Sequence, residues 1–326
     1  MSRVVVTDSP FARTDLEAAV AKSHRASFAA YNCSAEEETL RATGQAQVVF
    51  NNFAPITAKV LAGLAADATV IRYGVGYDNV DIAAATELGV RVSNVPDYGT
   101  ATVAEHAAAL LFALLRRLPH YNATIKADGW CATRAFGELR AFASTTVGLV
   151  GTGRIGMALA ERLRPFGFKI IAHDPFVSAA ALQAVGITPV SFAQVLGESH
   201  AVSLHLPLNP ATHHLIDATA LGLMRSDAVI VNTARGGLVD VRALAAAIES
   251  GALAGAGLDV FESEPLDSYS PLRGLDQVIL TPHVAFVSAD ASAKLQRMAA
   301  EEADRALSGT DLRNWVNPPS TGQEFR

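Results

Sequence analysis

The stretch that decides the fold runs from Thr146 to Pro175 and reads TVGLVGTGRIGMALAERLRPFGFKIIAHDP. Its apolar run at residues 147–150 fits a buried parallel strand. Directly after that run, Gly151, Gly153 and Gly156 stand in the spacing G-x-G-x-x-G. This order of strand and glycines is typical of a loop that holds a dinucleotide.

Each glycine has its own role in such a loop. Gly151 permits the tight turn, Gly153 lets the backbone approach a pyrophosphate, and Gly156 lets helix and strand pack closely. The helical stretch Ile155–Leu163 follows, and its N-terminus would offer unpaired N–H groups and a positive dipole end to phosphates. Glycine turns also occur for packing alone. Here strand, glycines, helix and a second strand appear in order, so we expect a dinucleotide site.

An acidic residue, Asp174, closes the second strand, Phe168–Ala172 with His173 after it. There it can accept hydrogen bonds from the adenosine ribose hydroxyls. A 2′-phosphate would lie beside this carboxylate, and Pro175-Phe176 supply no cation to offset it. Two like charges about 4 Å apart cost about 1 kcal/mol in water and about 4 near a protein surface. The sequence therefore favours NAD over NADP.

Length and composition narrow the class of protein. The 326 residues predict two domains, and half of them are apolar while 18% are charged, which is typical of a globular chain. The net charge of −6 gives no reason to expect nucleic acid or an anionic membrane as a partner. The start, MSRVVVTDSPFAR, lacks the apolar core of a signal peptide, and the apolar run Ala107–Leu115 is too short to cross a bilayer. We expect a cytoplasmic protein.

The two cysteines, Cys33 and Cys131, have no metal-ligand spacing. A structural disulfide is not expected in a cytosolic enzyme. We predict free thiols and no metal site.

Short apolar runs alternate with helical patterns through residues 1–99, which predicts a small parallel sheet covered on both faces. The expected strands are Val4–Val6, Ala26–Ala30, Val48–Phe50, Val70–Arg72 and Val90–Ser93, and the expected helices are Asp15–Ala21, Ala35–Thr43, Thr57–Ala65 and Ile82–Leu88. After Val70–Arg72 comes a turn with two glycines, Gly74 and Gly76. Ligands in such sheets bind beyond the carboxyl ends of strands, so the N–H groups of Val75 and Gly76 can meet a substrate carboxylate there. A glycine turn with nothing bound is the alternative.

A long apolar helix, Thr100–Leu118, follows a Pro/Gly-containing crossing. It contains Glu105 and His106, which we expect to be structural groups with partners rather than catalysts. Further strands are predicted at Ala201–Leu206, Ala228–Asn232, Gly255–Val260 and Val278–Leu280, with helices Phe192–Leu196, Ala218–Met224 and Val241–Glu249 between them. They extend the glycine-loop unit into a doubly wound sheet of about six or seven strands. The last helix is Ala289–Leu307.

Three of these strands are followed at their carboxyl ends by polar residues that packing of a hydrophobic core does not explain. Arg235, Glu264 and His283 follow the strands at 228, 255 and 278. A guanidinium can grip the carboxylate and carbonyl oxygens of a 2-oxo acid. A histidine held by a carboxylate can donate a proton to that carbonyl as a hydride arrives. Together, after a nucleotide motif, they predict a dehydrogenase site.

With these motifs on the page, the chain resembles the NAD-dependent D-isomer-specific 2-hydroxyacid dehydrogenases over nearly its whole length. The resemblance rests on residues 74–81 (GVGYDNVD), on residues 150–156 with Asp174, on His205-Leu206-Pro207, and on residues 232–240 (NTARGGLVD), 257–265 (GLDVFESEP) and 281–283 (TPH). It implies two doubly wound α/β domains. A flavodoxin-like substrate domain would comprise residues 1–99 and 289–326, and a Rossmann cofactor domain residues 100–288.

The resemblance also implies roles for single residues. Arg235 would bind substrate, Glu264 would orient His283, and His283 would be the acid/base. Arg72, Val75 and Gly76 would contact substrate. The expected NAD contacts are Gly151, Gly153, Arg154, Ile155, Gly156, Asp174, His205, Leu206, Pro207, Thr212, Thr233, Ala234 and Asp259. The partner would be a small 2-oxo or 2-hydroxy acid, and the protein would be a homodimer joined through the cofactor domain.

Within the family two branches compete. Residues 72–79 (RYGVGYDN) and 282–286 (PHVAF) look like the C-terminal-binding-protein branch, whose members can bind NAD(H) as corepressor sensors with little turnover. Arg72 also stands where phosphoglycerate dehydrogenases carry an arginine. From a sequence that ends at Arg326 we expect no additional regulatory domain, which argues against a phosphoglycerate dehydrogenase other than a short form. We also expect no long disordered tail, which argues against a corepressor. An active dehydrogenase is the main hypothesis.

Overall fold

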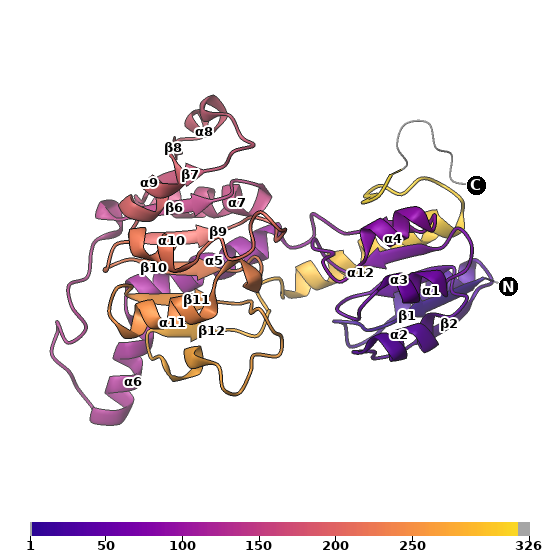
Figure 1. Cartoon of the computed structure of the whole chain (residues 1–326), viewed down its shortest axis with the longest axis horizontal. Coiled ribbons are helices and arrows are strands. Elements are labelled where there is room, and N and C mark those ends of the chain that lie inside the picture. The colour runs from indigo at the N-terminus through magenta and orange to yellow at the C-terminus, as the bar shows by residue number, and fades with distance from the viewer. Residues whose placement is uncertain (1, 319–326) are drawn as a thin grey trace. The chain divides into compact units, whose positions relative to one another are not determined.

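A computed structural model describes residues 2–318 of the chain. The chain forms two compact units, one of residues 1–99 with 288–326, the other of residues 100–287 (Figure 1). Residue 1 and residues 319–326, which belong to the expected substrate domain, lie outside the described part. Both units are parallel α/β sheets with helices on both faces, so the predicted fold class is confirmed.

The first unit is built on a five-stranded parallel sheet in the order β2-β1-β3-β4-β5, which is the flavodoxin-like order. Its strands are β1 (Arg3–Val6), β2 (Ser27–Ala30), β3 (Val48–Asn51), β4 (Thr69–Arg72) and β5 (Arg91–Ser93). The three central strands are apolar and buried almost throughout, because helices cover both faces.

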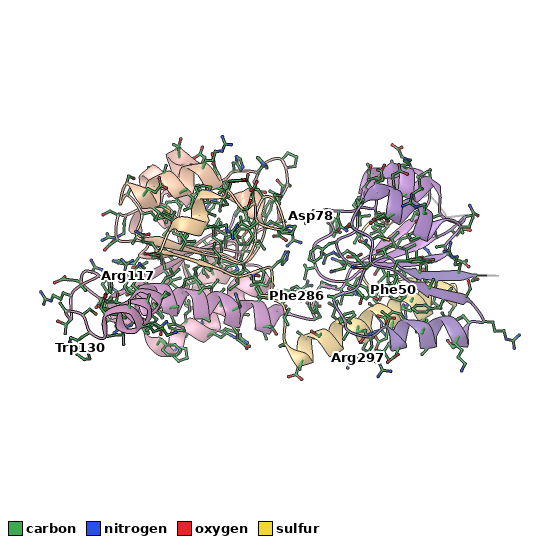
Figure 2. All side chains as sticks on the ribbon, turned by 90° about the horizontal axis from the view of Figure 1, so that it is seen from below. Phe50, Asp78, Arg117, Trp130, Phe286 and Arg297 are labelled. Carbon is green, nitrogen blue, oxygen red and sulfur yellow. The ribbon has the colours of Figure 1, made fainter. Side chains whose placement is uncertain are left out.

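Five helices of the first unit cover these faces: α1 (Asp15–Ser23), α2 (Glu36–Thr43), α3 (Ala58–Ala62), α4 (Ile82–Glu87) and the late helix α12 (Ala289–Leu307). One core joins α12 to the sheet through Leu295 and Ala299, which pack with Phe50 and Ile71. Figure 2 shows Phe50 among the side chains between the sheet and α12. The opposite face is closed by Val60, Leu61 and their neighbours.

The second unit has a seven-stranded parallel sheet in the order β12-β11-β10-β9-β6-β7-β8. Counted from β6, this is the Rossmann order 3-2-1-4-5-6 with one more strand at the edge. Its strands are β6 (Thr146–Val150), β7 (Lys169–His173), β8 (Thr188–Pro189), β9 (Ala201–Leu204), β10 (Val229–Asn232), β11 (Gly255–Leu258) and β12 (Val278–Leu280). The direction of the strand order reverses between β6 and β9, which makes the carboxyl ends there the expected ligand crevice.

Helices cover both faces of this sheet: α5 (Thr100–Leu115) and α7 (Arg154–Leu163) share one core, while α9 (Phe192–Glu198), α10 (Ala218–Leu223) and α11 (Val241–Glu249) share the other. The short helix α8 (Ala179–Ala184) precedes β8. No helix of the described residues is long and apolar enough to span a membrane.

The predicted helix 100–118 ends earlier than expected. Arg117 takes a left-handed φ of 53°, which stops α5 and starts a separate helix, α6 (Leu118–Asp128). None of the side chains of α6 is buried, and Trp130 just beyond it is 81% exposed. Figure 1 shows α6 standing away from the sheet of its own unit.

Candidate active site

The glycine loop after β6 has the three features expected of a dinucleotide cradle. Gly151 adopts φ 90°, a conformation that favours glycine. A Cβ on Gly156 would lie 2.4 Å from the Gly151 carbonyl oxygen, so only glycine lets α7 pack this close to the loop. Gly153 differs, because a Cβ there would meet no atom within 4 Å. The space over Gly153 is open, as a phosphate group approaching this backbone requires.

The N-terminus of α7 faces this open space without a side-chain cap. Gly153 is the N-cap residue and carries no side chain that could accept from the first N–H groups. Arg154 and Ile155 begin the helix, with Arg154 exposed and Ile155 half-buried. An uncapped helix N-terminus beside an open glycine is suited to an anionic diphosphate.

Asp174, one residue beyond β7, is hydrogen-bonded to this loop. Its Oδ2 accepts from the backbone N–H of Thr152 at 2.7 Å and from the Thr152 hydroxyl at 2.9 Å. Its Oδ1 accepts from the N–H of Phe176 at 2.9 Å. Burial alone would raise the pKa of Asp174, but these hydrogen bonds outweigh it and lower the pKa. The residue is therefore a charged, partly exposed carboxylate beside the glycine loop.

His205 follows β9 and packs beneath the same loop. Its backbone N–H donates to the Val150 carbonyl at 2.8 Å, and its Nε2 lies 2.9 Å from the Ser203 hydroxyl. Burial lowers the pKa of His205 to about 4, which keeps the imidazole neutral near pH 7. Leu206 and Pro207 continue along this edge, and the Thr212 hydroxyl donates to the Pro207 carbonyl at 2.7 Å, which closes the following turn.

The turn after β10 is shaped by a buried side chain, Asn232. Its amide donates to the Arg235 carbonyl at 2.8 Å and its Oδ1 accepts from the Ala234 N–H at 3.0 Å. Thr233 is buried, and within the described residues its hydroxyl has no hydrogen-bond partner. A buried hydroxyl without a partner at the end of a strand is available to hydrogen-bond a ligand. Sequence analysis named Thr233, Ala234 and Arg235 and missed the role of Asn232.

Two of the predicted catalytic residues are in direct contact. His283 Nδ1 lies 2.7 Å from Glu264 Oε2, and Glu264 Oε1 accepts from the Phe261 N–H at 3.0 Å. Burial alone would raise the pKa of Glu264, but the hydrogen bonds from His283 and Phe261 and the charges of His283 and Arg235 lower it. The carboxylate is thus held ionised beside the imidazole, with the third predicted residue, Arg235, close enough to act on it electrostatically.

Asp259 supports the backbone that carries His283. This carboxylate is fully buried and accepts from the Thr281 hydroxyl at 2.6 Å, from the Val284 N–H at 2.9 Å and from the Ala285 N–H at 2.8 Å. The Asp259 carbonyl accepts from the His283 N–H at 2.7 Å, and His283 itself takes φ 54°. Sequence analysis expected a cofactor contact at Asp259, which remains a prediction; the hydrogen bonds here position the turn.

The partners expected for Glu105 and His106 are present. Glu105 pairs with Arg162 at 2.9 Å. The His106 Nε2 lies 3.0 Å from the Thr281 hydroxyl, whose proton is directed at Asp259. His106, on α5, therefore contacts the hydrogen-bonded residues Thr281 and Asp259 that hold the His283 turn. This contact could not be predicted from the sequence, because it depends on the tertiary structure. The two cysteines are free thiols, as predicted, with Cys33 buried and Cys131 partly exposed.

The predicted substrate-binding turn lies in the other unit, after β4. Gly74 has φ 126°, and a Cβ there would lie 2.1 Å from Arg72 Nη1, so glycine is required. Arg72 is buried, with Nη1 2.5 Å from the Tyr73 carbonyl and its guanidinium 5.6 Å from the Phe53 ring centroid. Val75 is 44% exposed at the tip of the turn. Within the described residues, the N–H groups of Val75 and Gly76 donate no hydrogen bond, which suits a carboxylate acceptor.

Comparison with known proteins agrees with this geometry. Residues 108–285 match the family model of the NAD binding domain of D-isomer specific 2-hydroxyacid dehydrogenases. The D-3-phosphoglycerate dehydrogenase of Mycobacterium leprae is 43% identical over 267 residues, 80% of this chain and 49% of that protein. The glyoxylate reductase of Korarchaeum cryptofilum is 37% identical over 265 residues, 81% of this chain and 80% of that protein.

Among solved structures, the D-lactate dehydrogenase of Aquifex aeolicus complexed with NAD and lactic acid superposes with a TM-score of 0.86 at 26% identity, covering 97% of this chain and 100% of that one. The chain spans about half the length of the phosphoglycerate dehydrogenases that it matches. The family model covers more than half of the chain, and the glycine cradle and histidine–glutamate pair lie within it. The chain belongs to the D-isomer-specific 2-hydroxyacid dehydrogenase family and contains that family's NAD-binding domain.

Proposed function

We propose that this protein is an NAD-dependent dehydrogenase that interconverts a small 2-oxo acid and the D-2-hydroxy acid. The observation that carries the proposal is the His283–Glu264 hydrogen bond at the carboxyl edge of a sheet that also carries the open glycine loop and Arg235. NADH, when bound, would supply the hydride for C2 of the oxo acid. His283 donates the accompanying proton to the C2 oxygen, and in the reverse direction it accepts that proton.

The residues around His283 account for the proton transfer. Glu264 is ionised and stabilises the charged imidazolium that reduction requires. The planar guanidinium of Arg235 hydrogen-bonds the substrate carboxylate and polarises the carbonyl. Since Asp259 fixes the turn that bears His283, the imidazole is already oriented before substrate binds.

The cofactor contacts are part of this proposal. The diphosphate would bind over Gly153 at the N-terminus of α7, with Gly151, Gly156, Arg154 and Ile155 around it. Asp174 would accept from the ribose hydroxyls, and the orphaned Thr233 hydroxyl supports a further contact on the β10 side. His205, Leu206, Pro207, Thr212, Ala234 and Asp259 complete the proposed cofactor set.

Residues 100–288 would be the cofactor domain, and residues 1–99 with 289–326 the substrate domain. The NAD-binding family model within the second unit supports the first assignment. The assignment of the substrate domain is supported by the turn after β4. There the N–H groups of Val75 and Gly76 donate no hydrogen bond within the described residues, and Arg72 lies nearby, so the turn suits a substrate carboxylate.

A panel of oxo acids tests the proposal and narrows the substrate. NADH consumption would be measured with glyoxylate, hydroxypyruvate, pyruvate and bulkier 2-oxo acids, and NAD reduction with D-3-phosphoglycerate. We expect at least one of these acids to turn over. Where the 2-hydroxy acid formed is chiral, its D-isomer should be oxidised in the reverse reaction and its L-isomer should not. Tight NADH binding without turnover of any substrate would favour the sensor or corepressor-like alternative. Selective turnover of D-3-phosphoglycerate would identify a short-form phosphoglycerate dehydrogenase.

The proposal includes a homodimer joined through the second unit. The helix α6 buries none of its side chains, yet it carries Leu118 and Ile125 at 55% and 42% exposure, and Trp130 follows it. A protruding helix with exposed apolar side chains is suited to packing against a second copy of the same unit. Sedimentation of the wild type and of the double variant Trp130→Ser, Ile125→Ser tests the proposed dimer. A monomeric wild type would contradict it.

A cytoplasmic location also belongs to the proposal. The two free thiols, Cys33 and Cys131, are suited to a reducing compartment. Cell fractionation with activity measured in each fraction would test it.

A further inference from the structure

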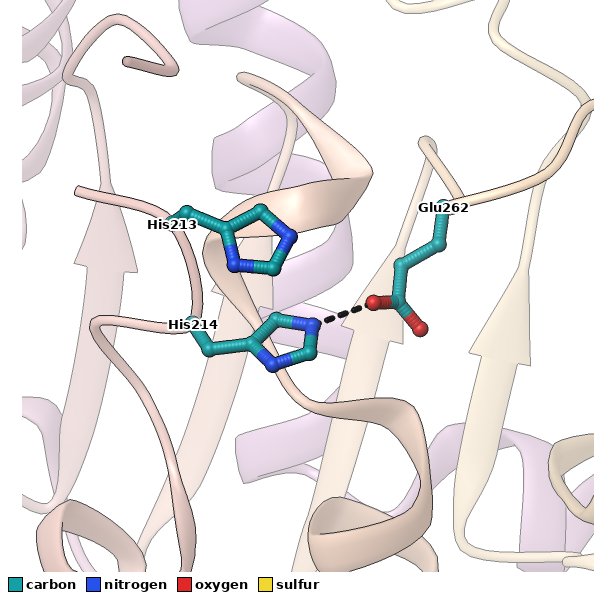
Figure 3. A group of neighbouring side chains, drawn as sticks. All are labelled: His213, His214 and Glu262. Carbon is teal, nitrogen blue, oxygen red and sulfur yellow. Dashed lines mark hydrogen bonds and ion pairs between the residues drawn. The ribbon is translucent and has the colours of Figure 1, made fainter. Parts of the chain in front are cut away.

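Three side chains outside the proposed catalytic set gather at one point of the second unit. His213 and His214 lie in the turn after β9, and Glu262 lies in the loop after β11. One donor atom from each lies within 4.8 Å of the other two. Figure 3 shows both imidazoles extending from the same turn toward the Glu262 carboxylate, with His214 Nε2 hydrogen-bonded to Glu262 Oε1.

The turn that carries the histidines is held in place by its own hydrogen bonds. Asn209 Oδ1 accepts from the N–H of Ala211 at 2.9 Å, and the Asn209 N–H donates to the Thr212 hydroxyl at 2.9 Å. The His214 N–H then donates to the Gly237 carbonyl at 2.8 Å. Since this backbone is ordered on both sides of His213, binding a ligand here costs little backbone entropy.

The two imidazoles are stacked and accessible. Their ring centroids are 4.0 Å apart with an interplanar angle of 25°. The side chains of His214 and Glu262 are 34% and 38% exposed, so an ion can reach them and they can rotate slightly. Two donors bound to one tetrahedral ion lie about 3.4 Å apart, given bonds of about 2.1 Å. Small side-chain rotations therefore suffice to bring the three atoms onto one ion.

The donor set selects a class of ion. Two imidazole nitrogens and one carboxylate oxygen suit Zn²⁺ and its neighbours Co²⁺, Ni²⁺ and Cu²⁺, whereas Mg²⁺ and Ca²⁺ prefer oxygen ligands alone. Three protein ligands leave a coordination position for water or a small anion. Neutral imidazoles with one carboxylate carry a net charge of −1, which a divalent ion more than offsets.

We propose that His213, His214 and Glu262 form a binding site for a divalent transition-metal ion, with Zn²⁺ as the probe. This inference does not depend on the proposed dehydrogenase activity. It departs from the sequence-based expectation of no metal site, because the ligands come from two loops far apart in the sequence and only the fold joins them.

Such an ion would cross-link two loops that border the proposed active site. A Cβ on Gly236, next to Arg235, would lie 1.9 Å from the Phe261 carbonyl carbon, so the turn after β10 packs directly on the segment that leads to Glu262. The N–H of Phe261 holds Glu264. An ion shared by His213, His214 and Glu262 would tie these segments together, and it should raise the melting temperature of the native protein.

Metal binding would be measured on the full chain, purified with chelator and then dialysed free of it. Calorimetric titration with Zn²⁺ should show one ion per chain, and Co²⁺ should give visible d–d absorption bands. His213→Ala and Glu262→Gln should each weaken Zn²⁺ binding at least about tenfold, a loss that even indirect ligand contacts can cause. Both side chains are exposed, so these variants should fold, and circular dichroism would check this.

A matched control is His24→Ala. His24 and Asp304 form a pair at 2.8 Å, and within the described part of the chain no third metal-ligating side chain joins them, so this variant should keep the full affinity for Zn²⁺. Binding at Cys33 or Cys131 would instead give a thiolate-to-cobalt charge-transfer band, which we expect to be missing. The inference is overturned if Zn²⁺ does not bind, if the thiolate band appears, or if His213→Ala and Glu262→Gln bind as the wild type does.

Discussion

Two histidine–carboxylate pairs, His283 with Glu264 in the second unit and His24 with Asp304 in the first, have almost the same N···O distance, through Nδ1 of His283 and Nε2 of His24. The N···O distances are 2.7 Å and 2.8 Å, and both histidine side chains are 23% exposed. The carboxylates differ, with 31% of the Glu264 side chain exposed against 59% for Asp304. Distance alone therefore does not distinguish the proposed catalytic pair from a surface pair.

What distinguishes them is the support behind each group. His24 is the C-cap residue of α1 and Asp304 lies on α12, so that pair links the surfaces of two helices. His283 sits at the end of a strand, its backbone held at φ 54° by bonds that return to Asp259, and Glu264 receives a second hydrogen bond from Phe261. Rigid backbone at the edge of a sheet, rather than the pair itself, is what the proposed chemistry needs.

Removing the two histidines gives the largest expected contrast. His283→Ala should lower kcat by about 10² to 10⁴, the range for a positioned general acid, because it removes the proposed proton donor. NADH affinity should change little, since the cradle lies on another loop. His24→Ala should retain wild-type kcat. Steady-state kinetics with the best oxo acid and a fluorescence titration of NADH would measure both. A His283→Ala enzyme within about threefold of the wild type would refute the acid/base role.

The preference for NADH over NADPH should not depend on either histidine–carboxylate pair, because we expect Asp174 to set it. The negative charge beside the ribose would repel a 2′-phosphate, so kcat/KM with NADH should exceed that with NADPH by more than about tenfold, which requires only about 1.4 kcal/mol. Glu264→Gln and Asp304→Asn should show the same ratio as the wild type, whereas Asp174→Ala should reduce it. Equal use of the two cofactors by the wild type would show that Asp174 is not at the ribose.

The support behind His283 can be removed while the pair is kept. In Asp259→Asn one carboxylate oxygen becomes an NH₂ group, which cannot accept from the N–H groups of Val284 or Ala285 and leaves buried donors unpaired at about 1–3 kcal/mol. We expect kcat to fall about tenfold with a lower melting temperature. Thr281→Ser, which keeps the hydroxyl that joins His106 to Asp259, serves as the conservative control. A lower melting temperature with unchanged kcat would reduce Asp259 to a stabilising role.

The smallest effect is a displacement of the pH profile. Because the pKa of Glu264 is lowered in the folded protein, its charge is present at all pH values above that lowered pKa and is lost only in more acidic solution. Reduction needs protonated His283 and oxidation needs it neutral, so the two directions should have opposite pH dependences. Glu264→Gln removes the countercharge and should move the reduction profile to lower pH by about one unit. Asp304→Asn should leave the profile in place. An unshifted Glu264→Gln profile would leave Glu264 only a packing role.

Much of the architecture follows from local sequence patterns. Apolar runs between helical stretches predicted both sheets, and α12 begins and ends where its pattern indicated. The predicted helix ran past the break at Arg117, although Arg116-Arg117 interrupt the apolar pattern and Pro119 follows. A proline inside a helical pattern is a local signal that one helix ends and another begins. The short strand β8 was also missed, since two residues show no periodicity.

The sequence by itself determined the glycine loop, the acid after β7 and the three polar strand ends, because each of these is a local pattern whose parts are adjacent in the chain. Only the tertiary structure decided what surrounds them. The hydrogen bonds from Thr281, Val284 and Ala285 to Asp259, the approach of His106 from α5, and the meeting of His213, His214 and Glu262 all join residues that are distant in the sequence. The physical reason is that a parallel sheet aligns the carboxyl ends of strands widely separated along the chain, so their loops become neighbours only after the strands have paired.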